Sequence, residues 1–165
     1  MTERVRKGLA ISPEGRRLFK DLSVEDNLRV GGVIHPTSFY AKDRERVLTL
    51  FPRLGERLNS LAGNLSGGEQ QMLAIGRALM TRPKLIMIDE LSLGLMPKVI
   101  DQCYQALKLL RSEGMTVLLV EQNTERALAT ADDVCVLESG ATVWRGSAVD
   151  ARNDPTLAAA YLGLH

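Results

Sequence analysis

The sequence predicts an α/β protein organised around a parallel sheet, and three segments in the middle of the chain carry this prediction. Residues 84–88 form a nearly continuous apolar run, which is typical of a strand buried on both faces. Residues 116–120 form a second such run. Between the two, apolar residues recur at helical spacing from Pro97 until Gly114 ends the pattern. A strand, a helix and a second strand in this order favour parallel pairing of the strands.

The segments on either side of this core add helices, one further strand and a hairpin. Upstream, we expect a strand over 8–12 that stops at the turn 13–15. We expect a helix that begins at a capping box at 23–26, runs toward Val30 and is closed by the glycines 31–32. Two further helices are expected over 41–51, where Pro52 ends the helix, and over 69–80. Downstream, we expect a helix that Asn123 caps and that runs to Thr130, a hairpin of 134–137 and 142–144, and a helix from Asp154-Pro155 to Tyr161. The hairpin is expected to add an antiparallel edge to the sheet.

Composition narrows the possible functions. The chain has 165 residues, which indicates one domain over 1–165, and its net charge of +1 gives no overall electrostatic reason to bind nucleic acid. The first twenty residues are locally basic, and we expect them to form a solvated face. The two cysteines are too few for a disulfide framework and lack the spacing of a zinc site. No apolar run approaches the ~20 residues that span a bilayer.

The segment Leu65–Gln71 contains a serine and two glycines directly before a helix. Glycines leave backbone N–H groups accessible, and Ser66 adds a hydroxyl, so the segment can cradle a phosphate at a helix N-terminus. The same residues also make an ordinary glycine turn with a serine cap, and by itself the motif favours that structural interpretation.

Two carboxylates, Asp89 and Glu90, follow the predicted strand 84–88. Ligands of parallel α/β sheets bind outside the carboxyl ends of the strands, and neighbouring residues on an extended chain point in opposite directions. One carboxylate can therefore bind Mg²⁺ while the other activates a water molecule as general base. A solvated acidic turn explains the pair about as well.

Taken together, these motifs are much more specific than either alone. The segment Leu65–Gln71, the helix that contains Gly76-Arg77-Ala78, and the strand that ends in Asp89-Glu90 resemble the signature-to-Walker B block of ABC-type ATPases. Further segments resemble the ATP-binding subunits of branched-chain amino acid importers, the LivF type. These segments are Pro13–Phe19, Ser92–Leu95, Val120–Asn123 and Ala160–Gly163. The resemblance implies a P-loop NTPase-like (RecA-like) fold, with a helical subdomain over about 16–65 and the catalytic core over 66–165.

The resemblance also implies a role for each site residue. In this family two nucleotide-binding domains sandwich two ATP molecules, so Ser66, Gly67, Gly68 and the fifth signature residue Glu69 would face the γ-phosphate of an ATP that the partner holds. Asp89 matches the ligand of Mg²⁺.

The remaining roles fall on three residues. Glu90 matches the catalytic base, Gln122 stands where most members have the switch histidine, and Glu14 stands where most have the Q-loop glutamine. The implied cofactors are ATP and Mg²⁺. The implied partners are transmembrane permease subunits and a second ATP-binding subunit, at the cytoplasmic face of the membrane.

One family motif is missing from this sequence. It contains no Gly-x-x-x-x-Gly-Lys-[Ser/Thr], the P-loop that grips the β- and γ-phosphates. Because the fold places the strand before that loop beside 84–88, we expect a central strand to keep an unpaired edge. The abrupt start of the match favours a partial reading frame of a longer ATPase, which as an isolated chain would be inactive. The alternative is a non-catalytic short subunit that donates only its signature motif to a complete partner.

Overall fold

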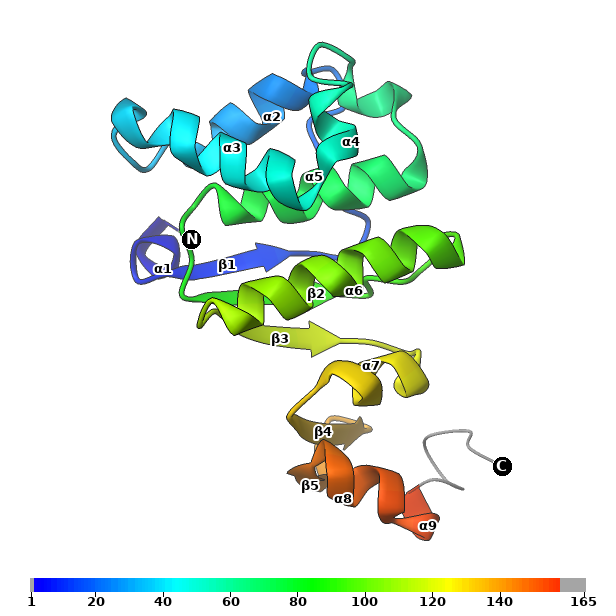
Figure 1. The fold of residues 1–165 in the computed structure, drawn as a ribbon. Coiled ribbons are helices and arrows are strands. Elements are labelled where there is room, and N and C mark those ends of the chain that lie inside the picture. Colours follow the sequence, from blue (N-terminus) through cyan, green and yellow to red (C-terminus); the bar gives the residue numbers. More distant parts are fainter. Residues whose placement is uncertain (1, 158–165) are drawn as a thin grey trace. The chain divides into compact units, whose positions relative to one another are not determined.

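A computed structural model of the protein describes residues 2–157, which divide into two compact units (Figure 1). The first unit ends at Val120 and the second begins at Glu121. The first contains strands β1 (Leu9–Ser12), β2 (Leu85–Asp89) and β3 (Thr116–Val120), helices α1 (Thr2–Arg6), α2 (Val24–Gly32), α3 (Tyr40–Leu50), α4 (Pro52–Gly55), α5 (Gly67–Leu79) and α6 (Pro97–Ser112), and 3₁₀ turns at Thr37–Phe39 and Ala62–Asn64. The second contains α7 (Thr124–Thr130), β4 (Asp133–Glu138), β5 (Ala141–Ser147), α8 (Ala148–Asn153) and α9 (Pro155–Leu157).

The sheet of the first unit is parallel, as the sequence predicts. Its strand order is β1-β2-β3, with Ser12 opposite Ile88 and Asp89 opposite Val120. The prediction that the strand 84–88 keeps an unpaired edge is wrong, because β2 pairs with β1 on one side and with β3 on the other. The outer edges of β1 and β3 are the ones that pair with no further strand among residues 2–157.

The two faces of this sheet differ in burial. One face packs against α5 and α6, and its central residues Ile86 and Ile88 are buried in the main core. On the other face Ile11 is 51% exposed and Leu118 is 51% exposed. Burial of the 116–120 strand on both faces is therefore a wrong expectation, since among the described residues the two long helices of this unit cover the same face.

The helical part of the first unit rests on α5. Helix α2 packs along α5, and helices α3 and α4 also contact it (Figure 1). Helix α2 ends at Gly32, as the sequence predicts, although both glycines are still helical and the C-cap is Val33. A Cβ at Gly31 would lie 2.3 Å from the carbonyl oxygen of Arg77, so glycine is present there for close helix packing.

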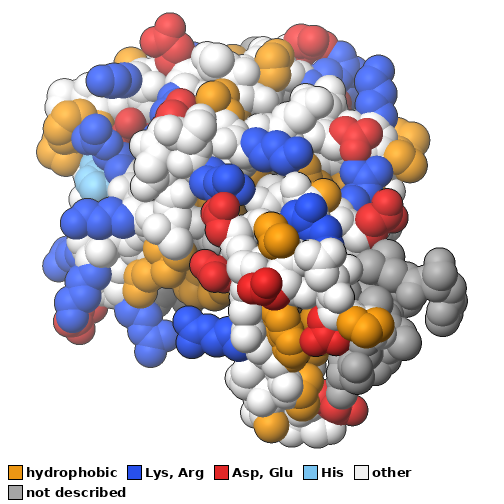
Figure 2. All heavy atoms as spheres, turned by 60° about the horizontal axis from the view of Figure 1, so that its bottom comes forward, with side chains coloured by type: hydrophobic (Ala, Val, Ile, Leu, Met, Phe, Trp, Pro, Cys, Tyr) orange, Lys and Arg blue, Asp and Glu red, His pale blue; other side chains and the backbone are white. Residues whose placement is uncertain are grey.

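The basic N-terminal segment is a solvated surface. Arg4, Arg6 and Lys7 are exposed, and Lys7 Nζ lies 2.9 Å from a carboxylate oxygen of Glu3. Figure 2 shows basic side chains gathered at the left of the visible face, the side where Figure 1 draws α1. This agrees with the sequence interpretation for Arg4, Arg6 and Lys7, whereas Arg16, which the same prediction included, is half-buried and bonds to α5.

The second unit has its own small core. Leu128, Ala148, Ala151 and Leu157 are buried together, and Asn123 caps α7 by accepting a hydrogen bond from the N–H of Arg126. Strands β4 and β5 form the predicted hairpin but pair only with each other among the described residues, so the expected antiparallel edge on the parallel sheet is wrong. The part of the last predicted helix beyond Leu157 lies outside the described residues. None of the helices among residues 2–157 has the length and hydropathy of a membrane span.

The two cysteines differ in reactivity. Cys103 is fully buried in α6, and burial raises the pKa of its thiol to about 12, whereas Cys135 is exposed on β4. Because the thiolate is the reactive form, we expect a thiol reagent at pH 8 to label one equivalent in the folded protein and two after denaturation. Cys135→Ser should remove the folded-state signal. Rapid labelling of both thiols would contradict the packing of α6.

Candidate functional site

Ser66 caps the N-terminus of α5 through a complete capping box. The backbone N–H of Ser66 donates to Glu69 Oε2 over 2.8 Å, and the backbone N–H of Glu69 donates to Ser66 Oγ over 3.3 Å. The Ser66 hydroxyl acts as acceptor in this bond, so its own proton is available to a further acceptor. The residue is exposed. The structure therefore has the serine cap and also presents the hydroxyl toward solvent.

Helix packing requires glycine at one of the two glycine positions of the motif and tolerates a side chain at the other. A Cβ at Gly68 would lie 2.6 Å from Val99 Cγ1 of α6, so close packing of the two helices requires glycine there. A Cβ at Gly67 would have only ordinary contacts, the nearest at 3.5 Å from the guanidinium of Arg16. The first N–H groups of a helix have no acceptor within it, and they favour an anion at this position.

Glu69 is buried and surrounded by hydrogen-bond donors. Its carboxylate lies 3.1 Å from Arg53 Nε and 3.8 Å from Arg57 Nε, in addition to its bond from Ser66. Burial by itself raises the pKa of this carboxyl group, but the bonds from Ser66 and the two arginines outweigh burial and lower it below the ordinary value. Glu69 is therefore ionised at neutral pH.

Acid should remove the stabilisation that Glu69 provides. A carboxyl group whose pKa is lowered on folding stabilises the native state above its unfolded pKa, and this contribution disappears as the pH falls through the folded pKa. We expect the free energy of unfolding to fall less steeply between about pH 5 and pH 3 in Glu69→Gln than in the unmodified protein. Denaturant titrations at a series of pH values measure this. Glu45→Gln, at an exposed position of α3, is the control, and an equal change in both variants would contradict the effect.

The turn that carries Glu14 is tied to α5 by two arginines. Gly15, Arg16 and Arg17 all have positive φ, which is unusual for arginine. Arg77 of α5 donates to the carbonyl oxygen of Arg17 over 2.7 Å and to that of Arg16 over 3.3 Å.

The side chain of Arg16 makes the second connection between this turn and α5. Its guanidinium donates to the Oε1 atoms of Gln70 and Gln71, each over 3.4 Å. Sequence reasoning missed these contacts, because only Gly15 marks the unusual turn and nothing in the sequence pairs residues 54–61 positions apart.

Asp89 is the last residue of β2, and Glu90 follows it in a strained conformation. The φ of Glu90 is 50°, and its backbone N–H donates to the carbonyl oxygen of Val120 over 2.9 Å. Non-glycine residues in this region cost on the order of 1–3 kcal/mol and cluster at functional sites. The bond to Val120 holds the start of the turn in place.

The donor set around Asp89 suits a metal that arrives with phosphates. Mg²⁺ commonly takes one or two protein carboxylates and completes its shell with phosphate oxygens and water. Within residues 2–157, no group of three or more His, Cys, Asp or Glu side chains could hold a metal by itself. One carboxylate at the end of a strand fits an Mg²⁺ ion that takes its other ligands from phosphate oxygens and water.

Most of the predicted site residues lie at the end of the parallel sheet where its strands have their carboxyl ends. Glu14 follows β1 and the pair Asp89-Glu90 lies at the end of β2, and the carboxyl ends of these two parallel strands lie next to each other. Helix α5 ends shortly before β2 begins, so its N-terminus with Ser66 lies toward the carboxyl ends of the strands. The contact of Arg16 with Gln71 agrees with this direction. Gln122 belongs to the second unit, where it is exposed and its N–H donates to Glu121 Oε2 over 3.0 Å.

Known proteins share both the sequence and the fold. Residues 1–92 match the ABC transporter family. The chain is 50% identical over 159 residues to the high-affinity branched-chain amino acid transport ATP-binding protein BraG of Pseudomonas aeruginosa, which covers 96% of this chain and 68% of that protein. It is 36% identical over 153 residues to the probable branched-chain amino acid transport ATP-binding protein LivF of Archaeoglobus fulgidus, which covers 88% of this chain and 62% of that protein. The chain thus spans about two thirds of the length of these relatives.

Solved structures confirm the predicted fold class. An ATP-binding cassette of an ABC transporter in its ADP conformation matches with a TM-score of 0.81 at 24% identity, over 98% of this chain and 70% of that one. An ATP-binding subunit of another ABC transporter also gives 0.81, at 28% identity, over 98% of this chain and 68% of that one. The predicted α/β, P-loop NTPase-like fold is therefore confirmed, and the chain belongs to the ABC transporter family, among its ATP-binding proteins of the LivF type.

Proposed function

We propose that this chain is part of the ATP-binding subunit of an ABC importer, and that the subunit couples ATP binding and hydrolysis to the uptake of branched-chain amino acids, related amides or urea. The single observation that carries the ATP-dependent role is the capped N-terminus of α5, where Ser66 presents a hydroxyl beside two glycines. The names of BraG and LivF support the class of solute.

In this proposal the chain's residues act at two places. Ser66, Gly67 and Gly68 bind the γ-phosphate of an ATP that the partner subunit holds, through the serine hydroxyl and the first N–H groups of α5. Asp89 binds Mg²⁺, which neutralises charge on the phosphates. Glu90 orients the attacking water and accepts its proton.

The proposal also assigns roles to Gln122 and Glu14. Gln122 can donate and accept hydrogen bonds at the γ-phosphate but cannot supply the positive charge of a histidine. Glu14 stands in the turn that Arg16 and Arg77 fasten to α5. A permease subunit that touches this turn at the cytoplasmic face of the membrane would therefore act through these contacts on α5, the signature helix that Ser66 caps.

A second candidate role is that of a short subunit that only donates its signature motif, which the capped N-terminus of α5 also supports. A chain that donates only its signature to a complete ATP-binding subunit would support one hydrolysis site without its own phosphate grip. Titrating this chain into a full-length subunit that contains Gly-x-x-x-x-Gly-Lys tests that role. A rise in ATP turnover supports it, and unchanged turnover rules it out.

The main proposal is tested by grafting. Residues 1–165 would replace the matching segment of full-length BraG, and the hybrid would be reconstituted with the permease subunits and binding protein of that transporter. We expect MgATP-dependent uptake of leucine into proteoliposomes. Turnover of ATP without uptake would leave the ATPase role intact and contradict the transport role.

Glu90→Gln in this hybrid should stop hydrolysis and preserve nucleotide binding. The substitution removes the charge that orients the water, while the Mg²⁺ ligand Asp89 remains. We expect turnover to fall at least about a hundredfold, the lower end of the range for loss of a general base, with little change in the Kd for MgATP. Turnover near that of the unmodified hybrid would remove Glu90 from the role of base.

A further inference from the structure

The signature helix contains a negative charge close to its phosphate-binding end. Glu69 lies three residues after Ser66 in the first turn of α5, is only 8% exposed, and is ionised. A carboxylate at this position stabilises the helix N-terminus. It also repels any second anion that approaches the same N–H groups, and low solvent exposure strengthens the repulsion. A phosphate-binding role for Ser66 therefore requires that this charge be compensated.

Two arginines on a neighbouring segment provide the compensation. Arg53 belongs to the short helix α4 and Arg57 follows it, and both guanidinium groups approach the carboxylate of Glu69. The side chain of Arg53 is 54% exposed and that of Arg57 is 43% exposed. Their principal contacts are therefore ionic, since neither side chain is fixed by burial in the core.

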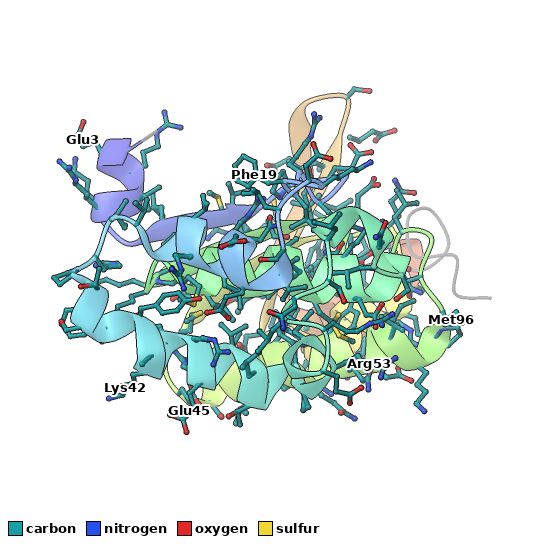
Figure 3. All side chains as sticks on the ribbon, turned by 90° about the horizontal axis from the view of Figure 1, so that it is seen from above. Glu3, Phe19, Lys42, Glu45, Arg53 and Met96 are labelled. Carbon is teal, nitrogen blue, oxygen red and sulfur yellow. The ribbon has the colours of Figure 1, made fainter. Side chains whose placement is uncertain are left out.

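A pocket beside this cluster keeps it in contact with solvent. It has a volume of about 580 Å³, and besides Glu69 and the two arginines it is lined by Asn64, Ser66, Met72, Lys98, Val99 and Gln102. Figure 3 labels Arg53 and Met96, the residue before α6, on the same side of the molecule. The lining has three cations against one carboxylate, and a second carboxylate, that of Glu56, pairs with Arg53 outside the lining.

We propose that Arg53 and Arg57 are positioning residues of the signature motif, which neutralise Glu69 and hold its carboxylate on the N–H of Ser66. The Ser66 hydroxyl and the N–H groups of Gly67 and Gly68 then face an incoming phosphate without a competing negative charge. This inference rests on the phosphate-binding role proposed above. The arginines act through Glu69 and do not themselves contact the nucleotide.

If the arginines act by neutralising Glu69, they are required only while residue 69 has a negative charge. Glutamine serves the same position of a capping box as glutamate does, because its amide oxygen accepts the Ser66 N–H. A glutamine at residue 69 has no charge to neutralise. Removal of both arginines should therefore matter when residue 69 is glutamate and matter little when it is glutamine.

The experiment measures this dependence in two backgrounds. Arg53→Gln and Arg57→Gln are made together in the 165-residue chain and in its Glu69→Gln variant, and each protein is titrated with MgATP into a full-length ATP-binding subunit. With Glu69 present, we expect loss of the arginines to lower the chain-dependent kcat at least about tenfold, as for other displaced site groups. In the Glu69→Gln background, the same two changes should alter it less than about twofold. Arg46→Gln, which breaks an ion pair with Glu113 on the first unit's surface, is the matched control.

A second readout does not depend on nucleotide. Hydrogen exchange of the Ser66 amide reports its bond to residue 69, and it should accelerate on arginine removal only when residue 69 is glutamate. If the unmodified chain does not raise turnover, the signature-donor role fails, and the exchange rates still decide the positioning role. Equal effects of arginine removal in the two backgrounds, or no effect on Ser66 exchange in either, would overturn the proposal.

Discussion

Replacement of Ser66 by arginine is expected to abolish the ability of this chain to raise ATP turnover in a complete ATP-binding subunit, with a loss of at least about a hundredfold. The new side chain would occupy the space in front of the first turn of α5, where the proposed phosphate approaches. It would also remove the hydroxyl donor. Removal of a single preorganised donor costs about 10²–10³ in kcat in other enzymes, and here steric exclusion adds to that loss.

Two comparison variants separate exclusion from loss of the helix cap. Ser66→Ala loses the same cap, worth about 1 kcal/mol of stability, and the same hydroxyl, but leaves the space open. We expect it to retain more activity than Ser66→Arg at equal folded fraction, which far-UV circular dichroism monitors. Ser38→Arg, which adds the same side chain at an exposed position well before the signature motif in the sequence, is the second comparison variant. Full activity of Ser66→Arg would contradict the placement of a phosphate at this helix end.

The sequence predicts the elements well where the local signals are strong. Two apolar runs became β2 and β3, Ser66 became the N-cap of α5, and Pro97 opens α6. Each of these rests on residues close together in the chain. The position of Asp89 and Glu90 at a strand end follows in the same way, since both residues directly follow the apolar run.

The errors arise where the outcome depends on residues that are distant in the sequence. The exposed face of β3 could not be predicted, because an apolar strand has the same sequence whether one or both of its faces are covered. The role of Gly68 likewise depends on Val99, which lies 31 positions later and fills the place of its Cβ.

The two arginines that contact Glu69 are the clearest example of a contact that the sequence does not predict. Arg53 and Arg57 precede Glu69 by 16 and 12 positions, and no periodic pattern connects them to it. A surface arginine and an arginine that neutralises a buried glutamate look the same in a sequence. Only the packing of α4 against α5 distinguishes them.

The same dependence on packing predicts the largest effect on stability, at Gly31 of α2. An alanine Cβ there would lie 2.3 Å from the carbonyl oxygen of Arg77 and 3.0 Å from the Cβ of Met80. A backbone atom cannot rotate away, so α2 and α5 must move apart. We expect Gly31→Ala to lower the free energy of unfolding by about 3 kcal/mol, the upper part of the usual range for overpacking, and to lower the Tm by roughly 10 °C.

The next residue of the same helix provides the control. A Cβ at Gly32 would lie 3.5 Å from Met80 Cε, an ordinary contact with the end of a flexible side chain. Gly32→Ala should therefore be neutral or stabilise the protein by up to about 0.5 kcal/mol, because alanine favours the helix. Equal loss in both variants would show that the close approach of α2 to α5 does not decide stability. A loss confined to Gly31→Ala would place the strain at Arg77, the residue that also holds the turn after β1 on the signature helix.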